Sequence, residues 1–331
     1  MNVRASPVPK SPAASGRRAT LHALVAAAIA GVLPLAAIAQ AVTLLTGRSS
    51  GVHHPLGVAL GTVLRKSLPS LKPSVKGTKG TAESLEELQQ GRAEIAFALG
   101  DTLSDAWKGR EDAGFRAPLD RLRSIGALFP NYIQVVARAD AGIRTLTGLR
   151  GKHVSVGVLK SGIELDARAI FSAAGLRYAS FGRIEYLPFG ESVELMKNRQ
   201  LDATLQSALL GVSGLRDLAT SVDIVVIAIP AEVLRKIDAD VYLPAVIPAN
   251  TYRGQTKDVP TVAVQNVLVT HEGVSDETVY SVTKTLWTSI GELTAAHPAA
   301  KAMDPSKALA GIVIPLHPGA ERYYRETGVL K

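Results

Sequence analysis

One pattern occurs three times along this chain: a short apolar segment, a loop of glycine and small polar residues, and then an amphipathic helix start. The three stretches are Val42–Gly57, Val75–Leu85 and His153–Ala174. Backbone N–H groups at a helix start lack partners within the helix, and the helix dipole adds partial positive charge there. The repeated pattern therefore predicts an α/β fold whose loops bind an anion such as a carboxylate or a phosphate.

Strand-like and helix-like segments alternate over most of the chain, which predicts a mostly parallel sheet with helices on both faces. The predicted strands include residues 42–45, 95–99, 125–129, 133–137, 153–156, 184–187, 201–205, 224–229 and 261–270. The predicted helices include residues 56–68, 163–174, 191–198, 209–218 and 276–296, whereas residues 245–256 are expected to be irregular.

The length of 331 residues leaves room for two domains of ordinary size. We expect two α/β lobes with a hinged cleft: lobe I from residues 40–131 and 247–331, and lobe II from residues 132–246. The chain would cross between them near Tyr132 and again near residues 246–262. Ligands of open α/β sheets bind at the carboxyl ends of the strands, where the predicted loops lie.

The first 39 residues fit a cleavable signal peptide. Arg17 and Arg18 precede an apolar run from Leu21 to Ala39 that ends in a small-x-small cleavage pattern. A transmembrane anchor is the alternative, because the length of the run is borderline. Cleavage would lower the formal charge from +8 to +4, so the basic balance is a poor argument for nucleic acid. The chain has no cysteine, so its stability must come from the burial of a core.

Candidate ligand contacts are the polar and cationic side chains of the three loops. Arg48 is the best of them, since its guanidinium can hold a carboxylate by two hydrogen bonds. Gln206 follows a strand that faces the predicted cleft. The full set of candidates is Arg48, Ser49, Ser50, His53, Thr78, Lys79, Thr81, Lys160, Ser161, Gly162 and Gln206.

Less specific interpretations of these residues stay open. The cations could point into solvent, and the hydroxyl residues could only form turns and helix caps, with Thr81 a candidate N-cap. His53 and His54 could bind a metal, although neighbours on a helix start diverge and a third ligand is missing at suitable spacing. Residues 47–51 match the G-x-S-x-G pattern of a serine hydrolase, but the downstream histidines do not lie in segments typical of catalytic loops.

Over nearly the whole stretch after the signal peptide, the sequence resembles the TAXI class of solute receptors for tripartite ATP-independent periplasmic (TRAP) transporters. Each short motif is weak alone, but together and in order they are specific. The motifs are Thr46–Gly57, Thr78–Leu85, Val156–Gly162, Leu201–Ala203, Ile247–Gln255, Val259–Val262 and Pro318–Tyr324.

The resemblance implies a type II periplasmic-binding-protein fold, a small organic acid or amino acid held between two lobes, and delivery to the membrane subunits of a permease. It implies no catalysis. We therefore expect a periplasmic, monomeric receptor without cofactor, metal or nucleic acid. A binding protein that serves a sensor kinase remains an alternative partner assignment.

The sequence departs from the family pattern in an informative way. The family usually has glycine where Arg48, Lys79 and Lys160 stand, one in each loop. It usually has tyrosine at His53 and His54. Three cations in three converging loops favour a ligand with more than one negative charge, such as a di- or tricarboxylate. An amino acid such as glutamate is the alternative, but an ammonium group would lack an obvious acidic partner in the first two loops.

Overall fold

The computed structural model describes residues 40–47, 52–237 and 240–331. The predicted signal peptide and the candidate contacts Arg48, Ser49 and Ser50 lie outside the described residues. Among the helices of the described part, none is both long and apolar enough to span a bilayer.

Ten strands of the described chain form one sheet, whose central order is β2-β1-β3-β10-β4-β7-β5-β6, with β8 beside β4 and β9 beside β10. The strands are β1 (Gln40–Leu45), β2 (Leu71–Lys76), β3 (Ile95–Leu99), β4 (Leu122–Arg138), β5 (His153–Ser155), β6 (Arg183–Glu185), β7 (Ala203–Ala208), β8 (Ile224–Ile227), β9 (Leu243–Ile247) and β10 (Val259–His271). The helices are α1 (His53–Ser67), α2 (Thr81–Gln89), α3 (Gly100–Lys108), α4 (Gly162–Ala173), α5 (Phe189–Lys197), α6 (Ser213–Ser221), α7 (Ala231–Leu234), α8 (Asp276–Thr288), α9 (Ile290–Ala296) and α10 (Pro318–Glu326).

The sheet is mixed, so the prediction of a mostly parallel sheet is wrong. Strand β1 pairs in parallel with β2 and β3, and β5 pairs in parallel with β6 and β7. The long strands β4 and β10 run antiparallel to each other and to their other partners. Strand direction depends on long-range pairing, which hydrophobic periodicity does not report.

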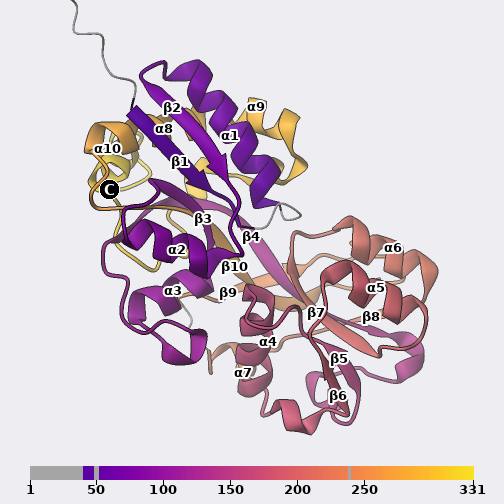
Figure 1. The fold of residues 1–331 in the computed structure, drawn as a ribbon. Coiled ribbons are helices and arrows are strands. Elements are labelled where there is room, and N and C mark those ends of the chain that lie inside the picture. The colour runs from indigo at the N-terminus through magenta and orange to yellow at the C-terminus, as the bar shows by residue number, and fades with distance from the viewer. Residues whose placement is uncertain (1–39, 48–51, 238–239) are drawn as a thin grey trace, which may run out of the picture. The chain divides into compact units, whose positions relative to one another are not determined.

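Helices cover both faces of the sheet in each of two halves (Figure 1). In the half built on β1 and β3, apolar residues of α1, α8, α9 and α10 bury one face, and those of α2 and α3 bury the other. In the half built on β7, residues of α4 and α7 cover one face, while α5 and α6 contribute to the core on the other. This is the two-lobe α/β architecture that the alternation of elements predicts.

The strands β4 and β10 contribute residues to the cores of both halves. Tyr132 lies where β4 changes partners, since it is in register with Ala263 of β10 and with Ala208 of β7. The predicted crossing near Tyr132 therefore falls at a change of strand pairing. The exact lobe boundaries remain a prediction.

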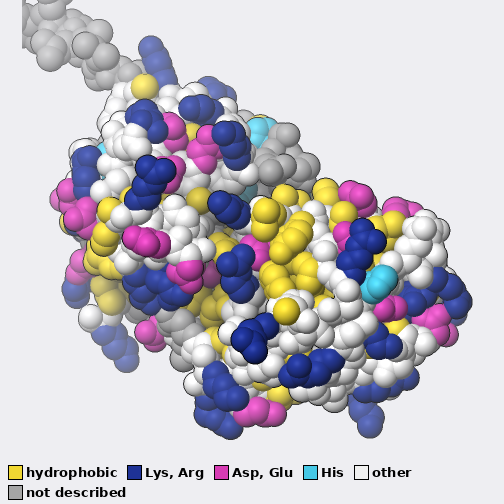
Figure 2. Space-filling model, turned by 60° about the horizontal axis from the view of Figure 1, so that its bottom comes forward, with side chains coloured by type: hydrophobic (Ala, Val, Ile, Leu, Met, Phe, Trp, Pro, Cys, Tyr) yellow, Lys and Arg dark blue, Asp and Glu magenta, His cyan; other side chains and the backbone are white. Residues whose placement is uncertain are grey.

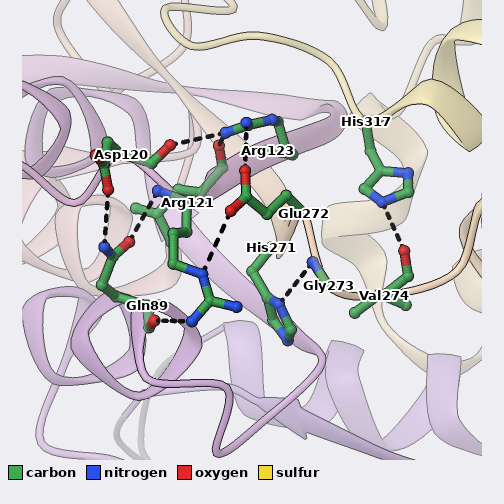
Figure 3. Close-up of polar contacts among 10 residues, drawn as sticks. Gln89, Asp120, Arg121, Arg123, His271, Glu272, Gly273, Val274 and His317 are labelled. Carbon is green, nitrogen blue, oxygen red and sulfur yellow. Dashed lines mark hydrogen bonds and ion pairs between the residues drawn. The ribbon is translucent and has the colours of Figure 1, made fainter.

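A polar network holds the edge of the sheet where β4 begins and β10 ends (Figure 3). The Glu272 carboxylate pairs with Arg123 at 2.7 Å and with Arg121 at 3.5 Å. The backbone carbonyl of Gln89 accepts from Arg121 Nη1 at 3.0 Å. Because β3 runs antiparallel to β10, this network lies at the amino end of β3, away from the loops of the candidate site.

Several predicted element boundaries need correction. Helix α1 begins at His53 and not at Leu56, so Pro55 is its third residue, a position where the missing N–H of proline costs nothing. The predicted helix 209–218 starts only at Ser213, and the predicted helix 276–296 is divided into α8 and α9. Residues 245–256 are not wholly irregular, because Leu243–Ile247 form β9 against β10. Ser161 caps α4, which is the alternative left open for the loop hydroxyls, and Gly175 follows the helix in the left-handed conformation typical of a helix end.

Candidate functional site

The first two loops lie side by side at the carboxyl ends of β1 and β2. The backbone N–H of Thr78 donates to the carbonyl of Gly47 at 3.0 Å. A Cβ placed on Gly77 would lie 3.3 Å from the same carbonyl oxygen, and one placed on Gly47 would lie 3.7 Å from Gly80 Cα. The strand–glycine–helix pattern thus brings residues about thirty positions apart into backbone contact.

His53 is fixed at the start of α1 by a hydrogen bond and by ring packing. Its Nε2 lies 2.7 Å from Asn266 Oδ1, and its ring lies 5.4 Å from that of Phe97. Because the Asn266 amide nitrogen donates to the carbonyl of Phe129, its oxygen accepts, and Nε2 of His53 carries the proton. Burial lowers the pKa of His53, so the ring is neutral near pH 7.

The adjacent His54 binds within its own loop, since its Nδ1 lies 2.9 Å from the hydroxyl of Thr46. The two histidines thus have separate partners. In the described ranges we find no group of three or more His, Asp or Glu side chains placed to hold a metal ion. In the described structure His53 is held by a hydrogen bond and ring packing, and His54 by a hydrogen bond.

The second loop is organised by Thr78 and not by Thr81. Helix α2 starts at Thr81 itself, and the residue before it, Gly80, supplies no side-chain cap, so the predicted N-cap role of Thr81 is wrong. The Thr78 hydroxyl lies 2.7 Å from the hydroxyl of the buried Ser84 and donates to the carbonyl of Gly80 at 3.1 Å. The Lys79 N–H donates to the Glu83 carboxylate at 2.5 Å. This loop is therefore set by local hydrogen bonds that no single-residue pattern indicates.

The third loop carries backbone strain and a buried acid. Lys160 adopts φ 59°, in the left-handed region that side chains other than glycine seldom occupy. Ser161 caps α4, because its hydroxyl accepts from the Glu164 N–H at 3.3 Å. The fully buried Glu164 carboxylate accepts from Arg168 at 2.8 Å and from the Tyr178 hydroxyl at 3.0 Å. Burial and the charge of Glu164 together raise the pKa of Tyr178.

Gly162 brings the third loop against the carboxyl end of β3. A Cβ on Gly162 would lie 2.4 Å from Leu99 Cδ1 and 3.7 Å from the Thr102 hydroxyl. Strand β3 pairs with β1, so Leu99 lies at the same sheet edge as the first two loops. Four helix starts, those of α1, α2, α3 and α4, therefore lie at or against this edge, and their free N–H groups and dipoles suit an anion.

Gln206 lies within β7 and is only 1% exposed. Its amide nitrogen donates to the Thr204 hydroxyl at 2.7 Å. Its register partner on β4 is Gln134, whose amide oxygen accepts from the Tyr252 hydroxyl. The proposed contact of Gln206 with ligand remains a prediction, and so do the contacts assigned to the loop residues.

The sequence patterns did not single out two acids, Asp101 and Asp166, whose carboxylates the structure buries. Asp101 follows the buried strand Ile95–Leu99 and Gly100, which is the same strand–glycine–helix pattern that identified the other loops. It was missed because Gly100 enters the helix directly, without a polar loop. Asp166 is one turn beyond Gly162 on α4, and its complete burial depends on packing from distant segments.

Figure 2 shows one face of the molecule, on which Lys and Arg side chains are spread among Asp and Glu side chains and hydrophobic side chains gather near the middle. Both signs of charge are thus interspersed over this face.

Comparison with known proteins gives two findings. The family model described as the NMT1-like family matches residues 44–328. Similar solved structures include a TctC solute-binding protein from Polaromonas (15% identity, TM-score 0.53, 88% of this chain and 99% of that one). They also include PhnD1 from Prochlorococcus marinus in complex with methylphosphonate (11% identity, TM-score 0.53, 88% and 99%) and XAC2383 from Xanthomonas citri bound to ATP (12% identity, TM-score 0.53, 88% and 97%). At these identities the structural matches concern the fold, and they confirm the predicted α/β periplasmic-binding-protein fold.

Proposed function

We propose that this chain, which belongs to the NMT1-like family of periplasmic solute-binding proteins, captures a small organic anion and delivers it to a membrane permease. The ligand class we favour is a di- or tricarboxylate. The permease we favour is of the TRAP type, with this chain as a TAXI-class receptor in the periplasm. Proteins of this family bind solutes and are not enzymes, so the serine-hydrolase alternative at residues 47–51 is rejected.

The observation that carries the proposal is the meeting of helix starts at one sheet edge. The Thr78–Gly47 hydrogen bond joins the first two loops, and Gly162 packs against Leu99 at the end of the adjacent β3. An anion at this edge would receive several backbone N–H groups and the positive ends of several helix dipoles at once.

The cations of the loops favour more than one negative charge on the ligand. Lys79 and Lys160 stand in the second and third loops, beside the helix starts, and both side chains are exposed. Each positive charge near a partly desolvated ligand would add about 1 kcal/mol of attraction, which corresponds to about a fivefold gain in affinity.

The acids of the same loops favour an organic acid over an amino acid. The Glu83 carboxylate already accepts from the Lys79 N–H, and the Glu164 carboxylate already pairs with Arg168. An incoming ammonium group would have to compete with these bonds. The amino-acid alternative therefore requires an acid from outside the three loops.

Titration calorimetry of the purified exported protein with citrate, succinate and glutamate tests this proposal. We expect citrate to bind most tightly and glutamate least. Lys79→Gln and Lys160→Gln should each weaken citrate binding about fivefold, whereas Lys72→Gln, which removes an exposed cation from β2, should leave it unchanged. Tighter binding of glutamate than of citrate would refute the assignment of the ligand.

A further inference from the structure

A cavity of about 520 Å³ lies beside the contact between α3 and α4. Its lining includes Asp101 and Ser104 from α3, Leu165 and Ala169 from α4, and Tyr242 from the segment before β9. A volume of this size accommodates a small molecule or a hydrated ion. None of the three candidate loops contributes to this lining, among the residues that the structure describes.

Two carboxylates are buried at this contact without adequate partners. Asp101 is 4% exposed and Asp166 is 0% exposed. Within the described residues, Asp101 Oδ2 has no hydrogen-bond partner, and the Asp166 carboxylate has only the hydroxyls of Ser207 and Tyr242 as donors, neither in close hydrogen-bond geometry. An unpaired buried carboxylate is unfavourable by several kcal/mol unless a proton or a cation neutralises it.

The environment of the pair explains why it requires neutralisation. Burial, and then the charge of Asp105, raises the pKa of Asp101 to about 7. Burial and the charge of Asp101 raise the pKa of Asp166 well above its usual value. Burial and the charge of Asp166 raise the pKa of Tyr242 in turn. The three groups therefore interact electrostatically at close range.

Both arginines that line the cavity have acidic partners of their own. Arg168 pairs with Glu164 at 2.8 Å, and Arg110 pairs with Asp112 at 2.8 Å. The charged and titratable groups that line the cavity or act on the carboxylate pair are, by element, Asp105 from α3, Arg168 from α4, Arg110 and Asp112 from the segment after α3, and Lys236 and Tyr242 from the segment after α7.

We propose that Asp101, which lines this cavity, and Asp166, which is fully buried outside its lining, together bind one small monovalent cation, either an ammonium group or an alkali-metal ion, that reaches Asp101 through the cavity. One monovalent cation balances one ionised carboxylate of the pair while the other carboxyl keeps its proton. An ammonium group could donate hydrogen bonds to the unpaired oxygens, and a sodium ion could be coordinated by them. This inference goes beyond the proposed capture of an anion and does not depend on it.

Binding of the cation exchanges it for a proton. In the empty site the carboxyl pair retains protons, and when the cation binds, at least one O–H bond is broken and its proton leaves to solvent. The affinity for the cation should therefore rise with pH, by about tenfold per pH unit for each proton released, and level off once the pair is ionised.

The experiment compares thermal unfolding of the purified protein in ammonium chloride, sodium chloride and tetramethylammonium chloride at equal concentration. Tetramethylammonium has the same charge but is bulky and lacks an N–H donor. We expect ammonium or sodium to raise the unfolding midpoint relative to tetramethylammonium, in a saturable manner and more strongly at pH 8 than at pH 6. A response to ammonium alone identifies a hydrogen-bonded ligand, and an equal response to sodium identifies a coordinated ion.

Variants locate the effect. Asp101→Asn and Asp166→Asn keep the side-chain shape and remove a buried acid. In each variant, the salt concentration that gives half of the rise in the unfolding midpoint should increase at least tenfold. The matched control is Asp217→Asn, which removes an exposed acid on α6, outside the lining of this cavity, and should keep the response. Equal midpoints in the three salts would overturn the proposal, and so would an undiminished response in both buried-acid variants. Citrate titration of the same samples reports on anion capture separately.

Discussion

The packing of α1 on the first loop can be tested by one methyl group. Gly57 lies in α1, and a Cβ there would lie 2.3 Å from Thr46 Cγ2 and 3.4 Å from Phe97 Cε2. Ordinary carbon contacts are 3.5–4.0 Å, so Gly57→Ala requires Thr46 to move by more than 1 Å. Thr46 resists this movement, because its side chain is branched at Cβ and its hydroxyl lies 2.9 Å from His54 Nδ1.

The cost follows from two opposing terms. Overpacking of this kind costs about 1–3 kcal/mol, and replacing glycine by alanine in a helix returns about 0.5–1 kcal/mol. We therefore expect Gly57→Ala to lower the free energy of unfolding by about 1–2 kcal/mol. In contrast, Gly190→Ala in the first turn of α5, where the new Cβ has no neighbour within 4 Å, should raise it slightly.

A second substitution should reverse the loss. Thr46→Ser removes the obstructing methyl group and keeps the hydroxyl that contacts His54. Urea unfolding of Gly57→Ala, Thr46→Ser and the double variant measures the coupling between the two positions, which we expect to be about 1 kcal/mol in favour of the pair. The reasoning is refuted if Gly57→Ala is as stable as the parent, or if Thr46→Ser leaves its loss unchanged.

Three further predictions concern single groups. Tyr324→Phe should lower the free energy of unfolding by about 2–3 kcal/mol in urea, since the buried hydroxyl accepts from Trp287 Nε1 at 2.8 Å and donates to the carbonyl of Ile125 at 2.9 Å; an unchanged midpoint would contradict this. Lys160→Gly should raise the free energy of unfolding by up to about 1 kcal/mol, because glycine adopts the left-handed backbone without strain, and it should weaken citrate binding. Tighter citrate binding by this variant would count against a role of Lys160 in binding. The pKa of Asp101 is about 7 in the folded protein, against an ordinary value of 3.8. Between about pH 4 and 7 the folded state therefore keeps a proton that the unfolded chain has lost, and the free energy of unfolding decreases as the pH rises through this interval. The difference in the free energy of unfolding between Asp101→Asn and the parent should therefore grow in favour of the variant from about pH 4 to 7 and then stay constant. A difference that does not change with pH, measured in tetramethylammonium buffer, would contradict this prediction.

Much of the fold could be predicted because its signals are local. Ser161 and Gly175 bound α4, and Ser275 caps α8, each through hydrogen bonds within a few residues. The course of β4 could not be predicted, because Pro130 suggested a break between two strands. In the structure β4 runs through Pro130. At this residue β4 pairs with β10 on one side, whereas pairing with β7 on the other side starts only at Tyr132. The proline, which has no N–H, therefore interrupts no hydrogen bond with β7.

The candidate site shows the same division. The loops were found because glycine, serine and threonine mark a strand-to-helix turn wherever it occurs. The buried acids were missed because Asp166 is one polar residue on an otherwise ordinary helix face. Its burial is caused by α3 and by the segment around Tyr242, which are about 60 or more residues away in the chain, and only the assembled structure brings them together.

The central claim is that loops far apart in the sequence surround one anion. Hydrogen–deuterium exchange of the protein with and without saturating citrate, read on peptides covering residues 52–56, 77–84 and 157–165, tests it most directly. We expect slower exchange in all three peptides on binding, with the polar network around Glu272 unchanged as an internal reference. Protection of only one of these peptides, or protection confined to other segments, would contradict a shared site.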